Sequence, residues 1–187
     1  MLKYIEEAGK FVEITGFRKI GIKDSEEFVE AARAELPQSD RVQFFDAKLV
    51  ATWQHLYFAV LNAVLAFKNE RNISKSLAIE SMLYASAQRQ IRKAIDFLGV
   101  KRSSSDIAVV IIGESAESVE ELLSIVSKHF GKEPDSEVLE IGNEKAEAIR
   151  EAFRITKTEL ETVLEKNSKS ALVDLVIERM ALLSTQL

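Results

Sequence analysis

Two ionisable residues near the middle of the chain could act together as an acid and its partner, Glu80 and His55. On a helical wheel at about 100° per residue, Glu80 falls at the centre of the apolar face of a helix expected from Lys75 to Leu98. A lone ionised carboxylate in an apolar layer costs several kcal/mol unless it is paired or hydrogen-bonded. We therefore expect Glu80 to be a structural hydrogen-bond hub, with His55, a backbone amide or an arginine as its partner. The alternative is a small soluble enzyme in which Glu80 is a buried acid and His55 assists it.

Other motifs of catalysis are incomplete in this sequence. The segment GESAE, Gly113 to Glu117, begins like a nucleophile elbow but has a glutamate where the motif requires a second glycine. The segment GFRKIG lacks the Lys-Ser/Thr ending of a P-loop. His55 and His129 have no companions at metal-ligand spacing, and there is no cysteine for a thiolate site or a disulfide. We expect no catalytic residue, no metal and no cofactor.

Basic residues gather where the helix around Glu80 is expected to start, in the stretch KNERNISK. A helix start presents unpaired N–H groups and a partial positive charge, so basic side chains beside it make a natural anion site. The anion would be an RNA phosphate, whereas the simpler interpretation is a solvated basic loop. The candidate contacts are Arg71, Asn72, Ser74 and Lys75 in this stretch, with Arg89 and Arg92 on the polar side of the helix.

The same helix carries apolar residues, among them Ile79 and Met82, on the arc opposite to Glu80. They are either covered by another part of the chain or form a docking surface for another protein. The preceding helix, from Thr52 to Lys68, is apolar around most of its circumference. It is therefore expected to be buried on nearly every side.

The composition is that of an ordinary soluble protein. The chain has 187 residues, 47% of them hydrophobic, and a formal net charge of −5, which gives no overall attraction to nucleic acid or to an anionic membrane. Any contact with RNA must therefore be local. The first residues, MLKYIEEAGK, lack the apolar run of a signal peptide, and no apolar stretch approaches the roughly 20 residues that span a bilayer. We expect a cytoplasmic protein without membrane contact.

Alternating or short apolar runs predict strands from Lys10 to Ile22, from Val42 to Ala47, from Ile107 to Ile112 and, as a possible short strand, from Val138 to Ile141. Amphipathic patterns and capping residues predict helices from Asp24 or Ser25 to Leu36, from Thr52 to Lys68, from Lys75 to Leu98, from Glu117 to Phe130 and, as two or three helices, from about Asn143 to Lys166 and from Ser168 to Leu183. Few strands separated by helices indicate an α+β fold, a small, mostly antiparallel sheet packed against a helical layer with a central long helix pair. We expect residues 1–187 to form a single domain, on which the C-terminal helical segment 134–187 is packed.

The stretch NISKSLAIESMLYASAQRQIRKAIDFLGV resembles the signature helix of one protein family, the PRPK-binding regulatory subunits of the KEOPS (EKC) complex. The shared pattern consists of Ile73–Ser74–Lys75, Glu80 five residues after that lysine, the pair Gln90–Ile91, and Gly99 followed by Val100. The segments EKAEAIREAFRITKTEL and LVIERMALL also resemble the closing part of this family. The similarity thus extends across nearly the whole chain, although the first 50 residues contribute little to it.

This resemblance implies a non-catalytic regulatory subunit of the archaeal type. Such subunits bind the small kinase-like ATPase of the complex, support the formation of N6-threonylcarbamoyladenosine in tRNA and, in archaeal relatives, bind the 3′ CCA end of tRNA. The resemblance also implies that the basic residues at the helix start, Arg71, Asn72, Ser74 and Lys75, contact tRNA. The expected ATPase-docking residues are Ile79, Met82, Leu175, Met180 and Leu183. A third hypothesis is a protein-interaction module without RNA contact.

Overall fold

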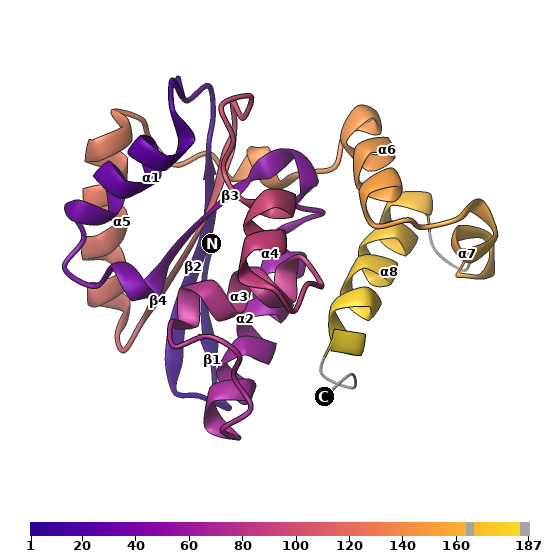
Figure 1. The fold of residues 1–187 in the computed structure, drawn as a ribbon, viewed down its shortest axis with the longest axis horizontal. Coiled ribbons are helices and arrows are strands. Elements are labelled where there is room, and N and C mark those ends of the chain that lie inside the picture. Colours follow the sequence, from indigo (N-terminus) through magenta and orange to yellow (C-terminus); the bar gives the residue numbers. More distant parts are fainter. Residues whose placement is uncertain (164–166, 184–187) are drawn as a thin grey trace.

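The computed structural model describes residues 1–163 and 167–183 of the chain. Its centre is a four-stranded antiparallel sheet with the strand order β1-β2-β4-β3 (Figure 1). The strands are β1 (Leu2–Ile5), β2 (Lys10–Phe17), β3 (Val42–Asp46) and β4 (Ile107–Gly113). The α+β fold class is confirmed, and three of the predicted strands are confirmed as β2, β3 and β4, although β2 already ends at Phe17.

Two short segments of the sheet region differ from the prediction. The edge strand β1, which we did not predict, forms a hairpin with β2 in which Leu2 pairs with Glu13. The predicted strand at Val138 to Ile141 is wrong, because Ser136–Leu139 forms the 3₁₀ helix η3. This helix packs across β2 at Gly16, where an added Cβ would lie only 2.6 Å from the Cβ of Val138. Tertiary packing against a glycine, and not strand pairing, therefore decides the conformation of this segment.

Helices cover both faces of the sheet (Figure 1). The helices α1 (Ser25–Ala34) and α5 (Ala116–Phe130) lie on one face, and α2 (Trp53–Lys68) and α3 (Leu77–Ala85) lie on the other, with α4 (Ile91–Leu98) beside α3. Alternate residues of β4 point into two separate cores, so that Val109 packs with α1 and α5 whereas Val110 packs with α2 and α3. A strand that is buried on both faces has no polar side, which explains the unbroken apolar run of β4.

The second helix of the predicted central pair is broken into two shorter helices. We predicted one helix from Lys75 to Leu98, but the structure has α3 and α4 with a break between Ser86 and Gln90. At the break Ala87 adopts a left-handed conformation with φ 51°, and the amide of Gln88 donates to the carbonyl of Leu83 at 3.0 Å, a common way to end a helix. The sequence hid this break because the position is an alanine, whereas glycine is the usual residue for it.

The C-terminal part of the chain is helical, as predicted. It contains α6 (Asn143–Ala152), α7 (Lys157–Thr162) and α8 (Ser168–Leu183), while residues 164–166 and 184–187 lie outside the described residues. The helix α8 contacts α2 and α3, and α6 contacts η2 (Ala47–Leu49) at the end of β3. Phe153, Leu172 and Val176 form the centre of a third core at this junction. No described helix combines the length and the apolar character that crossing a membrane requires.

Candidate functional site

Glu80 is buried, with 1% of its surface exposed, and its carboxylate is fully engaged by the backbone. The amide of Ile73 donates to both carboxylate oxygens at 3.1 Å, and the amide of Ser74 donates to one of them at 2.7 Å. Of the three kinds of partner that we considered, backbone amides are the ones that the structure provides. Glu80 of α3 therefore binds the loop that precedes this helix. Its role is structural.

This arrangement changes the interpretation of the expected anion site. The loop amides that a phosphate could have used are already bound to Glu80. Asn72 donates through Nδ2 to the carbonyl of Ser74 at 2.9 Å, and the hydroxyl of Ser74 donates to the carbonyl of Ser76 at 2.7 Å. Ser74 is also buried. Asn72 and Ser74 therefore hold their own loop, Ser74 inside the molecule and Asn72 with part of its surface exposed. Their contact with RNA stays a prediction.

The basic residues of the predicted set lie on the surface. Arg71 and Lys75 are exposed in the loop before α3, and Arg89 and Arg92 are exposed at the start of α4. Of the six predicted residues, four thus have exposed side chains, Asn72 is partly exposed and Ser74 is buried.

His55 is also sealed inside the molecule, with none of its surface exposed. Its Nδ1 accepts a hydrogen bond from the amide of Ala51 at 3.1 Å, so Nε2 carries the proton and donates to the carbonyl of Ala85 at 2.8 Å. Burial lowers the pKa of His55 to about 4. His55 and Glu80 therefore have separate backbone partners at opposite ends of α3, and neither is accessible to a substrate. This arrangement argues against the enzyme hypothesis for this pair.

Most of the expected docking residues belong to the interior. Met82 and Met180 are 1% and 0% exposed, and only Ile79 among the five is partly exposed. Leu175, Met180 and Leu183 are covered because α8 packs its apolar side on the rest of the chain. The expectation that these side chains form an open docking surface is corrected for four of the five, Met82, Leu175, Met180 and Leu183. Composition alone could not indicate which apolar faces the chain covers by itself.

A groove of about 590 Å³ lies between α1, the edge strand β3, α3 and the end of α4. We call it the α1/α4 groove. Its apolar lining consists of Val29, Phe44, Ile79, Met82, Ile95 and Val100. Its polar lining comprises Glu26, Glu30, Arg33, Gln43, Asp96 and Lys101. The side chain of Ile95 is 44% exposed. An apolar surface with a few polar groups at its margin is typical of a ligand site.

Arg33 is the distinctive polar residue of this groove. One of its Nη atoms donates to Oε1 of Gln43 at 3.3 Å, but its Nε is buried without a hydrogen-bond partner. No ion pair of Arg33 occurs in the described ranges, and burial lowers the pKa of its guanidinium. A guanidinium has five donors in a fork that fits a carboxylate or a phosphate. Arg33 therefore places a partly buried positive charge in the lining of the groove.

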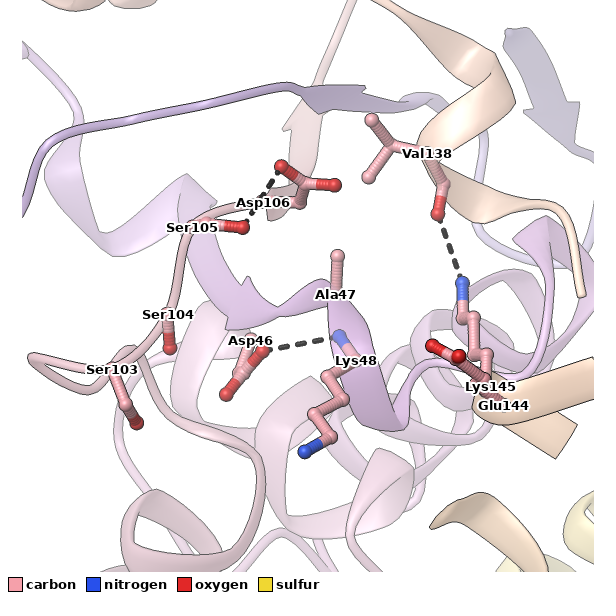
Figure 2. Close-up of a pocket in the computed structure, with 10 residues that line it drawn as sticks. All are labelled: Asp46, Ala47, Lys48, Ser103, Ser104, Ser105, Asp106, Val138, Glu144 and Lys145. Atoms are coloured by element: carbon pink, nitrogen blue, oxygen red, sulfur yellow. Dashed lines mark hydrogen bonds between the residues drawn. The ribbon is translucent and has the colours of Figure 1, made fainter. Parts of the chain in front are cut away.

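A second, more polar cavity of about 360 Å³ lies at the end of the sheet (Figure 2). Lys145 of α6 donates to the carbonyl of Val138 at 2.9 Å, and burial lowers the pKa of its ammonium to about 8. On the other side, Asp106 accepts hydrogen bonds from the hydroxyl of Ser105 and the amide of Lys19. These bonds tie loops and α6 together. Within the residues that the structure describes, no group of three or more His, Asp or Glu side chains could hold a metal ion.

Apolar side chains of α2 and α8, two helices that contact each other, remain at the surface. Phe58 of α2 is 37% exposed and Leu182 of α8 is 42% exposed. We call these two residues, together with the partly buried Trp53, Tyr57, Leu61 and Ile177, the α2/α8 face. The ring of Tyr57 lies 6.1 Å from that of Trp53 and 5.7 Å from that of Phe58. The signal in the sequence was the nearly continuous apolar circumference of α2, from which we predicted burial on nearly every side.

These features define a small α+β protein in which the buried Glu80 and His55 stabilise the fold. Its surface has an apolar face on α2 and α8 and a groove beside β3. The chain belongs to the family described as kinase binding protein CGI-121, whose profile matches residues 17–184. It is similar to a curated archaeal protein, the regulatory protein Cgi121 of Methanocaldococcus jannaschii, with 37% identity over 128 residues. That alignment covers 67% of this chain and 80% of the relative. The family resemblance drawn from residues 72–100 is confirmed.

Removing the carboxylate of Glu80 should destabilise the protein strongly. Glu80→Ala leaves the buried amides of Ile73 and Ser74 without acceptors, and we expect the free energy of unfolding to fall by about 3 kcal/mol. Glu80→Gln keeps one acceptor oxygen and should cost about half as much. Urea denaturation followed by circular dichroism measures both changes. Equal stability of Glu80→Ala and the wild type would show that this carboxylate does not hold the loop.

Acid should destabilise the protein through His55. Its pKa is about 4 in the folded protein and about 6.5 in an unfolded chain, so its contribution to stability is complete above pH 6.5 and is lost as the pH falls towards 4. The loss amounts to about 3 kcal/mol. The free energy of unfolding of His55→Gln should therefore change less steeply than that of the wild type between pH 6.5 and 4. Parallel curves for the two proteins would contradict this assignment.

Proposed function

We propose that this protein is a non-catalytic regulatory subunit of the KEOPS complex in the cytoplasm. In this proposal it binds the kinase-like ATPase through the α2/α8 face and holds the 3′ CCA end of tRNA in the α1/α4 groove. It thereby supports the formation of N6-threonylcarbamoyladenosine in tRNA. The observation that carries the RNA part is the partly buried guanidinium of Arg33, which has no ion pair within the described residues and lines an apolar groove.

Membership in a family named for kinase binding supports the ATPase as partner. The α2/α8 face contains three aromatic side chains, Trp53, Tyr57 and Phe58, a residue class that is enriched at the centres of protein interfaces. Its aromatic residues also contact one another, which fixes their orientation before binding. Met180 and Leu183, which the sequence suggested as docking residues, support this face from beneath.

The α1/α4 groove suits the end of a single-stranded RNA. Unstacked bases at such an end bind apolar and aromatic surfaces, while cations contact the phosphates. The apolar lining around Ile95 and Val29 supplies the first element, and Arg33 and Lys101 supply the second. The body of the tRNA would extend over exposed basic side chains at the starts of α3 and α4, whose helices both line the groove. We propose Arg71, Lys75, Arg89 and Arg92 for these contacts.

The proposed subunit would influence the complex in two ways. Docking on the ATPase would favour one of its conformations through differential contacts, a coupling of about 1–3 kcal/mol. Holding the tRNA end would add a second attachment point and raise the effective concentration of the substrate. Because the net charge is −5, the RNA contact has to be confined to a patch, and its affinity should be modest and sensitive to salt.

A second candidate function is a protein-interaction module without RNA contact. It is favoured by the three acidic residues of the groove, Glu26, Glu30 and Asp96, which repel phosphates. Binding of tRNA with and without its CCA end separates the two functions.

Charge placed on the α2/α8 face should abolish docking without unfolding the protein. Phe58→Glu and Leu182→Glu alter exposed side chains, so the melting temperature should change little. We expect each to weaken binding of the purified kinase-like ATPase by about thirtyfold or more in calorimetric titration, as for residues at the centre of an interface. Ile91→Glu, which changes an equally exposed residue of α4, is the matched control. If only the control weakened binding, docking would have to occur at α4.

Removing the guanidinium from the groove should reduce RNA binding. Arg33→Met keeps the aliphatic part of the side chain, and we expect about tenfold weaker retention of tRNA in a filter assay and a salt dependence reduced by about one phosphate contact. Arg154→Met, in an exposed turn outside the groove, should leave both quantities unchanged. Equal retention by the wild type of tRNA with and without its CCA end would contradict the proposed RNA role.

A further inference from the structure

Lys145 of α6 lines the polar cavity at the end of the sheet, which we call the Lys145 cavity (Figure 2). The side chain of Lys145 is only partly exposed. Its Nζ donates to the carbonyl of Val138 at 2.9 Å and, within residues 1–163 and 167–183, makes no other hydrogen bond and no ion pair. An ammonium has three N–H donors. The described residues therefore provide an acceptor for one of the three.

The surroundings of this amine favour its neutral form. An ammonium that is removed from water loses hydration, so a buried lysine releases its proton more readily than an exposed one. Burial lowers the pKa of Lys145 from 10.5 to about 8, against the opposing effect of the nearby Glu140, Asp106 and Asp46. At pH 7.5 the neutral fraction of such an amine exceeds that of an ordinary lysine on the order of a hundredfold. A neutral lysine amine is the nucleophile that forms Schiff bases with carbonyl compounds.

The charges around Nζ decide which carbonyl compound fits. The titratable groups near it are Asp46 of β3, Lys48 of η2, His55 of α2, Asp106 before β4, Glu140 after η3 and Glu144 of α6. Carboxylates predominate in this set, so an anionic compound is repelled. An acyl group on Nζ would also remove the positive charge that the carboxylates stabilise. A protonated Schiff base keeps that charge, and it keeps one N–H for the carbonyl of Val138.

We propose that Lys145 is a covalent binding site for a small uncharged aldehyde, which it holds as a protonated Schiff base. The lone pair of the neutral Nζ forms a bond to the carbonyl carbon, and the π electrons of the carbonyl group move to its oxygen. One proton passes from the nitrogen to this oxygen, which gives a carbinolamine. A proton from solvent then lets the hydroxyl group leave as water while the nitrogen lone pair completes the C=N bond.

The Lys145 cavity is suited to a ligand of this size. Its volume of about 360 Å³ lies at the lower end of the range for small-molecule sites. It shares no lining residue with the α1/α4 groove. The proposal is therefore independent of the proposed contacts with tRNA and with the ATPase.

Reductive trapping of the full-length protein tests this site. Sodium cyanoborohydride supplies the hydride that converts a Schiff base with butyraldehyde into a stable secondary amine, and mass spectrometry of peptides locates the adduct. Lys48, whose exposed side chain lines the same cavity, is the internal control. At pH 7.5 we expect Lys145 to be labelled at least tenfold faster than Lys48. The ratio should fall as the pH rises from 8 to 10, because the neutral fraction of an ordinary lysine is still increasing in this range.

Two further measurements distinguish a binding site from a lysine that is merely reactive. The labelling rate of Lys145 should saturate with the butyraldehyde concentration, because binding in the cavity precedes bond formation, whereas that of Lys48 should stay proportional. Succinic semialdehyde has the same four-carbon chain but ends in a carboxylate, so its preference for Lys145 over Lys48 should be several-fold smaller. Glu140→Gln should narrow this difference between the two aldehydes, whereas Glu133→Gln, which alters an exposed residue that does not line the cavity, should not.

The proposal would be overturned if the folded wild type were labelled equally fast at Lys145 and Lys48. A rate at Lys145 that rose in proportion to butyraldehyde without saturation would overturn it as well, because the lysine would then react without a site for the aldehyde. Faster labelling of Lys145 by succinic semialdehyde than by butyraldehyde, relative to Lys48, would contradict the role of the carboxylates.

Discussion

The hydrogen bonds of the buried Glu80 carboxylate hold the start of α3, and the α1/α4 groove depends on the position of this helix. The amides of Ile73 and Ser74 satisfy this buried polar group, which would be costly without partners. At the other end of α3, the buried ring of His55 binds the carbonyl of Ala85. The helix is therefore held at both ends by polar groups inside the core. This fixes the position of Ile79 and Met82, which α3 contributes to the groove.

The sheet explains why the two candidate surfaces lie where they do. Helices cover both of its faces, and α2 has one apolar side against the sheet and another against α8. Since α8 covers only part of the second side, aromatic residues of α2 remain at the surface. At the edge of the sheet opposite to β1, the edge strand is β3. The groove beside it forms because α1 and α4 lie next to this edge without closing over it.

Electrostatics gives the groove its chemical character. The protein is acidic as a whole, and its surface gives no general attraction to a polyanion. Within the groove, a partly buried guanidinium and three solvated carboxylates lie on an apolar lining.

The sequence by itself determined the features that depend on neighbouring residues along the chain. The apolar run of β4, the helix α2 and the capped helix α5 could be predicted because their signals are local, and the motif from Ile73 to Val100 indicated the family. The break at Ala87 and the 3₁₀ helix at Val138 could not, because neither has a distinctive residue type and both are set by contacts. The partners of Glu80, the burial of Met82 and the groove around Arg33 were decided only by tertiary structure. Each of them depends on which elements distant in the sequence come together, and periodicity along one helix carries no information about its neighbours.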